Sequence, residues 1–164
     1  MLLCHFLYFK KFEIVYIYIC FIYNVIEYKV NKTKLNFFID GPRSQYDVLE
    51  IEKVQLLVHE YCADLKFNIT IQKQNIGLAN SIITGVSELL KKSESVIVIE
   101  DDVLLSTHFL SFMNEALQVY ADDEKVLSIG SWNYFCDPSE LSGNFFFRFP
   151  DSIAWATFDR AWKL

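Results

Sequence analysis

The chain has no excess of positive charge, no paired cysteines and no uninterrupted apolar run long enough to cross a bilayer. Its 21 Asp and Glu residues outnumber its 15 Lys and Arg residues, and the resulting formal charge of -6 argues against general nucleic-acid binding. The four cysteines form neither a CxxC pair nor a zinc-binding spacing, so we expect reduced, mostly buried thiols and a cytoplasmic location. With 164 residues, 52% of them hydrophobic, the chain is long enough for one domain with a sizeable core.

The first 34 residues are unusually apolar, and their structure is left open by the sequence. Within residues 14–26, Asn24 is the one strongly polar residue. This stretch of about 13 residues is shorter than the roughly 20 that span a bilayer, and no small-residue cleavage site of a signal peptide follows it. Residues 15–19 are rich in tyrosine and β-branched side chains, which favours a strand. Two alternatives remain: a buried segment, or peripheral contact of residues 1–30 with the inner face of a membrane.

From residue 35 onward, predicted strands alternate with predicted helices. This alternation predicts right-handed crossovers and an α/β fold, in which a mostly parallel sheet carries flanking helices. We expect residues 35–164 to form one such domain. The predicted strands are 35–39, 67–71, 96–99 and 126–129, and the predicted helices are 46–62, 78–90 and 107–120.

Three consecutive acids follow the most apolar of these strands. Glu100, Asp101 and Asp102 come directly after residues 96–99, which read as a strand buried on both faces. Carboxylates are costly to bury unless they are paired or bind a metal, and α/β proteins place ligands at the carboxyl ends of their strands. The triplet therefore suits a hard cation such as Mn²⁺ or Mg²⁺. The alternative is that the acids merely precede the helix 107–120 and favour its positive N-terminal end.

Two more loops are expected at the same edge of the sheet. Asp40 begins a turn, Asp-Gly-Pro, that stops one predicted strand, and residues 130–132 follow another. The carboxyl ends of parallel strands meet at one edge, so these loops should converge with the acidic triplet. Taken alone, Asp40 is better explained as a turn-forming residue before glycine.

Four segments occur along the chain in the order FFIDGP, NIGLANSIITGV, VIVIEDDVLLSTHFLSFMNEAL and SIAWATFDRAW. Together they resemble glycosyltransferases of the GT-A fold, and in particular bacterial family-2-like sugar transferases related to the N-acetylglucosaminyltransferase I group. The resemblance covers roughly residues 34–164. It implies a metal-dependent enzyme that transfers a sugar from a nucleotide-diphosphate sugar, first of all a UDP-sugar, to a glycan or lipid-linked acceptor.

The same resemblance implies roles for individual residues. Asp40 matches the acid that hydrogen-bonds the base or ribose of the donor, and Asp102 matches the acid that binds Mn²⁺ or Mg²⁺. Gly77 and Asn80 match the loop and helix start beside the donor, although helix capping explains them equally well. The remaining donor-binding positions, which match residues that contact the sugar or ribose, are Glu100 and Asp101.

The end of the chain adds an aromatic cluster. Trp155, Phe158 and Trp162 recur at helical spacing, so we expect a helix whose rings belong to the core. The resemblance implies instead that this segment forms a wall near the donor sugar and acceptor. Asp159 is not assigned as the general base, because the resemblance implies a base further along, beyond Leu164.

Two departures from the family pattern leave other functions open. The family opens with a strand that ends in a polar stretch holding the nucleotide, and nothing in residues 1–34 matches it. The chain also stops inside a predicted helix, so we expect a GT-A-like domain that is incomplete at both ends. A catalytically inactive, truncated remnant of such an enzyme is therefore one alternative. An unrelated doubly wound phosphate-binding domain is another.

Overall fold

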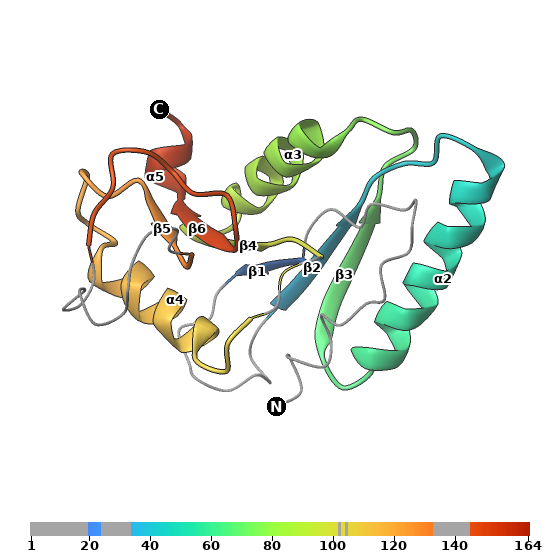
Figure 1. Ribbon diagram of the computed structural model, residues 1–164, viewed down its shortest axis with the longest axis horizontal. Helices are drawn as coiled ribbons and strands as arrows, with labels where there is room; N and C mark the ends of the chain where they lie inside the picture. Colours follow the sequence, from blue (N-terminus) through green and yellow to red (C-terminus); the bar gives the residue numbers. More distant parts are fainter. Residues whose placement is uncertain (1–19, 24–33, 102, 104, 133–144) are drawn as a thin grey trace.

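The computed structural model describes residues 20–23, 34–101, 103, 105–132 and 145–164. In these residues six strands form one mixed sheet with helices on both faces (Figure 1). The strands lie in the order β3-β2-β1-β4-β6-β5 across the sheet. Along the chain they are β1 (Cys20–Tyr23), β2 (Lys34–Ile39), β3 (Lys66–Ile71), β4 (Ser95–Ile99), β5 (Ser128–Gly130) and β6 (Trp155–Phe158).

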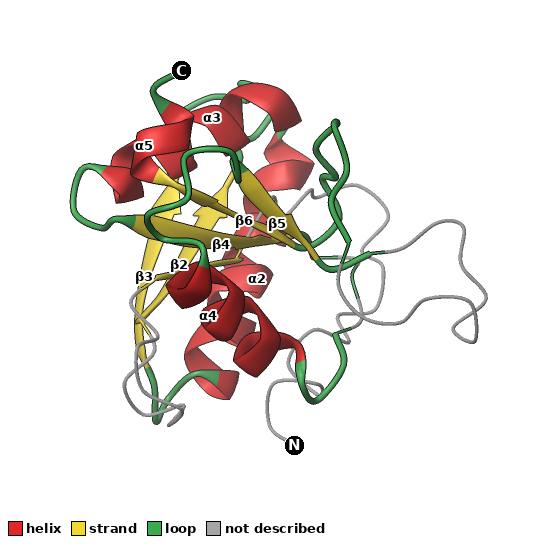
Figure 2. Ribbon diagram, turned by 90° about the vertical axis from the view of Figure 1, so that its left-hand side faces the viewer, coloured by secondary structure: helices red, strands yellow, loops and turns green. Residues whose placement is uncertain are grey.

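Helices cover the sheet in two layers. Figure 2 shows α3 and α5 on one face and α2 and α4 on the other. The prediction of an α/β fold with flanking helices is confirmed, because the four predicted strands and the three predicted helices all form close to their expected positions. The helices in the described residues are α2 (Gln45–Tyr61), α3 (Leu78–Leu90), α4 (Phe109–Val119) and α5 (Asp159–Trp162).

The sheet differs from the predicted mostly parallel one because β1 and β6 run antiparallel to their neighbours. Strands β2 and β3 pair in parallel, whereas β1 pairs antiparallel with β2 and β4, and β6 pairs antiparallel with β4 and β5. It follows that β2, β3, β4 and β5 all run in one direction, so their carboxyl ends lie at one edge. The predicted parallel neighbours are wrong beyond β2 and β3, because an antiparallel strand lies between β2 and β4 and another between β4 and β5.

The aromatic segment near the end of the chain is a strand where the spacing of its rings predicts a helix. Residues Trp155–Phe158 pair with strands on both sides, and only Asp159–Trp162 form a short helix. Ala156 and Phe158 pack into one core while Trp155 packs into the other, which is the alternation of a strand. The helical spacing of three rings was therefore coincidental. The expectation that the rings belong to the core is confirmed.

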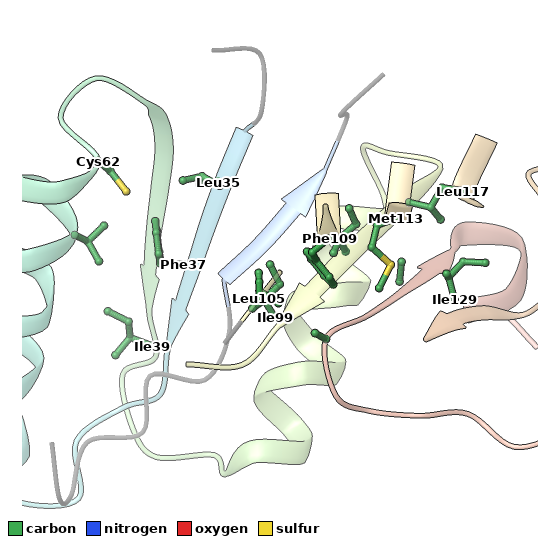
Figure 3. Close-up of a cluster of buried hydrophobic side chains, with 14 of the residues drawn as sticks. Leu35, Phe37, Ile39, Cys62, Ile99, Leu105, Phe109, Met113, Leu117 and Ile129 are labelled. Atoms are coloured by element: carbon green, nitrogen blue, oxygen red, sulfur yellow. The ribbon is translucent and has the colours of Figure 1, made fainter. Parts of the chain in front are cut away.

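Apolar side chains form one core on each face of the sheet. The larger core lies under α2 and α4, and Figure 3 shows side chains of both helices meeting those of the sheet there. The smaller core lies under α3 and joins Val86 and Leu89 to Phe38, Val96 and Val98. Strand β4 contributes to both cores and is buried on both faces, as predicted.

The buried cysteine expected from the sequence is present at the end of α2. Cys62 is a free thiol without solvent exposure, and burial raises its pKa to about 12. The thiol therefore stays protonated at neutral pH and is a poor nucleophile. The side chains of the other cysteines lie outside the described residues.

Of the apolar N-terminal 33 residues, the structure describes strand β1. The predicted strand over residues 15–19 lies outside the described residues. In the part of the chain that is described, no helix combines the length and the apolar character needed to cross a membrane.

Helix α2 begins with a reciprocal set of hydrogen bonds. The Ser44 hydroxyl accepts from the Asp47 N–H, and the Asp47 carboxylate accepts from the Arg43 N–H at 2.8 Å. The Arg43 guanidinium also approaches that carboxylate at 3.4 Å. These interactions, with the backbone hydrogen bond as the largest cause, hold the pKa of Asp47 below its usual value of 3.8.

A lowered pKa in the folded state predicts how stability depends on pH. The contribution of Asp47 should be fully present above the pKa of the unfolded chain and should be lost as the pH falls through the lowered folded pKa. Urea unfolding of Asp47→Asn should therefore show a lower midpoint than wild type at pH 7 and a shrinking difference below about pH 4. Asp64→Asn, at an exposed acid, serves as the control. A difference that stays constant from pH 7 to pH 3 would contradict the prediction.

Candidate functional site

The common direction of four strands brings their following loops to one edge of the sheet. These are the segments that begin at Asp40 after β2, at Gln72 after β3, at Glu100 after β4 and at Ser131 after β5. Strand β6 runs the other way, so its first residue, Trp155, lies at this edge too. The convergence expected from the sequence is therefore present in the fold.

Asp40 joins two of these loops through its carboxylate. Oδ1 accepts from the N–H groups of Gly41 and Ile76, each at 2.8 Å, and Oδ2 accepts from the Gly77 N–H at 2.8 Å. The side chain is buried, with 4% of its surface exposed. Asp40 thus positions the start of α3 and contacts Gly77, another predicted site residue. Its contact with a nucleotide remains a prediction, for which one lone pair on Oδ2 is still available.

The two loops also approach each other through their backbones. The Gln72 N–H donates to the Ile39 carbonyl at 3.0 Å, and the Asn75 side chain donates to the Gly41 carbonyl at 3.3 Å. A Cβ atom on Gly41 would lie 2.2 Å from the backbone carbonyl carbon of Gln74. Only glycine allows this approach, so Gly41 is needed for space rather than for its dihedral angles.

A glycine is needed at position 77 because of the backbone dihedral angles there. It precedes the first turn of α3 with φ 80° and ψ 163°, a region that is essentially restricted to glycine. The first turn of α3 holds no acid, and no side chain of the helix caps it. Asn80 is exposed, and its amide donates to the Ile76 carbonyl at 2.8 Å. The structure thus brings Asp40, Gly77 and Asn80 together around one helix start.

The acidic loop follows β4 at the same edge. Glu100 and Asp101 are partly buried and both have interaction partners. Asp102, the predicted metal ligand, lies outside the described residues. Among the residues that are described, no group of three or more His, Cys, Asp or Glu side chains is arranged to hold a metal ion. The metal site therefore remains a prediction, although carboxylate oxygens at a strand end are suitable donors for Mn²⁺ or Mg²⁺.

A strained turn leads into β6 beside the acidic loop. Ala154 has φ 46° although it is not glycine, and it is buried. The Ser131 hydroxyl donates to the Ala154 carbonyl at 2.6 Å, and the Ile153 N–H donates to Asp151 Oδ1 at 3.1 Å. Backbone strain of this kind is often retained where a site requires a fixed geometry. The sequence contains no sign of this turn, because nothing in an alanine reveals a positive φ.

The register of the sheet places this turn between two of the converging loops. Trp155 is paired with Val98 of β4 on one side and with Gly130 of β5 on the other. Two residues beyond Val98 the chain reaches Glu100, and one residue beyond Gly130 it reaches Ser131. The turn therefore belongs to the same edge as the predicted donor-binding acids.

On the α3 side of the sheet, two buried polar side chains have no hydrogen-bond partner among the residues that the structure describes. They are the hydroxyl of Ser81, near the start of α3, and the indole N–H of Trp155, at the start of β6. Each such group costs about 1–3 kcal/mol relative to a hydrogen-bonded one. Ser81 lies near the N-terminal end of α3 and Trp155 at the N-terminal end of β6, and both of these ends lie at the edge of the sheet that carries the loops. A ligand oxygen or an ordered water there would satisfy both groups.

The charged residues at the end of the chain lie away from this edge. Strand β6 carries the chain to the opposite edge, where the Asp159 N–H donates to the Glu94 carbonyl at 2.8 Å. Arg160 donates to the carbonyls of Tyr120, Ala121 and Val126, each at 2.8–2.9 Å, and so joins α5 to the end of α4. Of the three rings in the implied wall near donor and acceptor, only that of Trp155 belongs to a residue at the loop edge.

No protein-family model, curated protein or solved structure matches this chain.

Proposed function

We propose that this chain is a GT-A-like nucleotide-sugar-binding domain of a metal-dependent glycosyltransferase. One observation carries the proposal: the segment held by Asp40 and the segment after β4 with Glu100 and Asp101 lie at the same edge of the sheet, with β1 between their strands. The resemblance assigned these segments to one donor site although they are far apart in the sequence. The unpartnered groups of Ser81 and Trp155 and the strained Ala154 support a ligand site at this edge.

The proposed chemistry is displacement at the anomeric carbon of the donor sugar. An acceptor hydroxyl forms the new glycosidic bond, the bond to the diphosphate breaks, and the nucleoside diphosphate leaves with the electron pair. A divalent cation held by Asp102 would supply positive charge to the departing diphosphate. Glu100 and Asp101 would hydrogen-bond the sugar or ribose, and Asp40 would fix the loop that contains Gly77. No residue of this chain is assigned as the base that takes the acceptor proton.

Calorimetric titration with UDP in the presence and absence of Mn²⁺ tests the proposal. We expect binding that requires the metal and is weakened at least about tenfold by Asp102→Asn, because a ligand of the cation is lost. Asp122→Asn removes an exposed acid from the turn after α4, near the opposite edge of the sheet, and should bind as wild type does. Binding of UDP that is unchanged in Asp102→Asn would contradict the metal role of this residue.

A second candidate is a domain that keeps this fold without transferring a sugar. It is favoured by the direction of β1, which pairs Cys20 with Ile99 and Tyr23 with Lys34. The carboxyl end of β1 therefore points away from the loop edge, so residues after it begin at the wrong edge to hold a nucleotide. A folded chain that binds none of UDP, GDP, dTDP and CMP with Mn²⁺ would favour this candidate over the first.

A further inference from the structure

The segment before β6 exposes an unusual number of aromatic rings. Phe145, Phe146, Phe147 and Phe149 are 39%, 69%, 52% and 62% exposed. Removing apolar surface from water is favourable, so four exposed rings within five residues leave a large area that a partner could bury. Contiguous apolar surface of this kind marks an interaction site in a soluble protein. We call these four residues the phenylalanine patch.

The rings of the patch are arranged against one another and against α4. Phe147 stacks on Phe149 with centroids 5.2 Å apart, and Phe145 meets Phe147 edge to face at 4.8 Å. Phe146 meets the ring of Tyr120, at the end of α4, at 5.6 Å. These contacts give the patch a defined shape without burying it. A defined apolar shape suits a structured partner surface.

The surroundings of the patch carry charges of both signs. Arg148 is exposed within the patch, and the exposed acids Asp122, Asp123 and Glu124 begin two residues after Tyr120, the ring that Phe146 contacts. A surface that holds an apolar centre, a cation and a group of anions can complement a second copy of itself. A two-fold dimer that paired Arg148 of one copy with these acids of the other would make that contact twice.

We infer that two copies of this chain associate through the phenylalanine patch. The contact is isologous, with the rings at its centre and Arg148 opposite the acids that follow Tyr120. A membrane is the less suitable occupant, because the formal charge of -6 opposes approach to an anionic lipid surface. Figure 1 shows α4, β5 and β6 at one end of the molecule and α2 at the other. Exposed apolar residues of α2 therefore serve as control positions for substitutions in the patch.

Sedimentation equilibrium of the full chain between about 1 and 100 µM tests this inference. We expect a monomer–dimer equilibrium whose dissociation constant rises at least about tenfold in Phe147→Asp/Phe149→Asp, because central aromatic residues dominate most interfaces. Tyr46→Asp/Leu56→Asp changes two exposed apolar residues of α2 and should dimerise as wild type does. Circular dichroism confirms that each variant is folded.

A charge exchange tests the orientation of the dimer. Arg148→Glu should weaken dimerisation, and Asp122→Lys/Glu124→Lys should weaken it as well, whereas the three substitutions together should restore it. The inference is overturned by a wild-type chain that stays monomeric, by a dimer that survives the Phe147→Asp/Phe149→Asp change, or by assembly beyond a dimer. None of these results depends on whether the chain binds a nucleotide.

Discussion

Replacing Asp40 with alanine is expected to lower the free energy of unfolding by about 3–5 kcal/mol. The carboxylate of Asp40 accepts hydrogen bonds from three backbone N–H groups, two of which belong to Ile76 and Gly77 in a different loop. In Asp40→Ala these N–H groups stay buried without the acceptor they have in wild type. The start of α3 also loses the negative charge of the Asp40 carboxylate. The measurement is urea unfolding followed by circular dichroism.

Asp40→Asn separates the charge of this residue from its shape. The amide keeps one acceptor oxygen but turns an N–H₂ group toward a backbone donor, so we expect a loss of about half that seen with alanine. Asp64→Ala, at an exposed acid, should change stability by less than about 0.5 kcal/mol. If Asp40→Ala unfolds at the same urea concentration as Asp64→Ala, then the three hydrogen bonds do not hold the loops together.

Replacing Gly41 with alanine is expected to cost about 2–4 kcal/mol, although only one methyl group is added. The new Cβ would lie 2.2 Å from the carbonyl carbon of Gln74 and 2.4 Å from its oxygen, and neither backbone atom can rotate away. The loops after β2 and β3 must therefore separate. This separation should also lengthen the hydrogen bonds of Asp40 and disturb the edge where the proposed donor site lies.

Two other glycines provide controls for Gly41. A Cβ on Gly130 would lie 3.5 Å from the Cβ of Asp151, an ordinary contact, so Gly130→Ala should be nearly neutral. A Cβ on Gly77 would meet nothing, but its φ of 80° should cost Gly77→Ala about 1–3 kcal/mol. We therefore expect stability losses in the order Gly41, Gly77, Gly130. A Gly41→Ala chain as stable as Gly130→Ala would show that the two loops are not in contact.

Local patterns in the sequence were sufficient to predict most of the elements of this fold. Residues 96–99 form the buried strand that their apolar run predicts, and α3 begins after Gly77 as the apolar stripe that follows it predicts. Each of these signals is confined to a few neighbouring residues. The common direction of β2 to β5, and therefore the edge at which the loops meet, followed correctly from the alternation of strands and helices.

Features that depend on distant residues could not be predicted in this way. Nothing within residues 155–158 indicates that they pair with both β4 and β5, and their ring spacing matches a helix equally well. Asp40 could be read as a local turn former or as a nucleotide contact, whereas its hydrogen bonds reach Ile76, 36 residues further along the chain. The strain at Ala154 likewise depends on Ser131 and on the two flanking strands.

The measurement that most directly tests the central claim is paramagnetic broadening by Mn²⁺ in amide NMR spectra of the chain saturated with UDP. If the converging loops form one metal-dependent donor site, the amides of Gly41, Gly77 and Ser131 should broaden together. The amides of Asp64 and Asp123, in turns that precede β3 and β5, should stay sharp. These effects should disappear in Asp102→Asn. Broadening of the Asp64 and Asp123 amides instead, or no selective broadening at all, would contradict the proposed site.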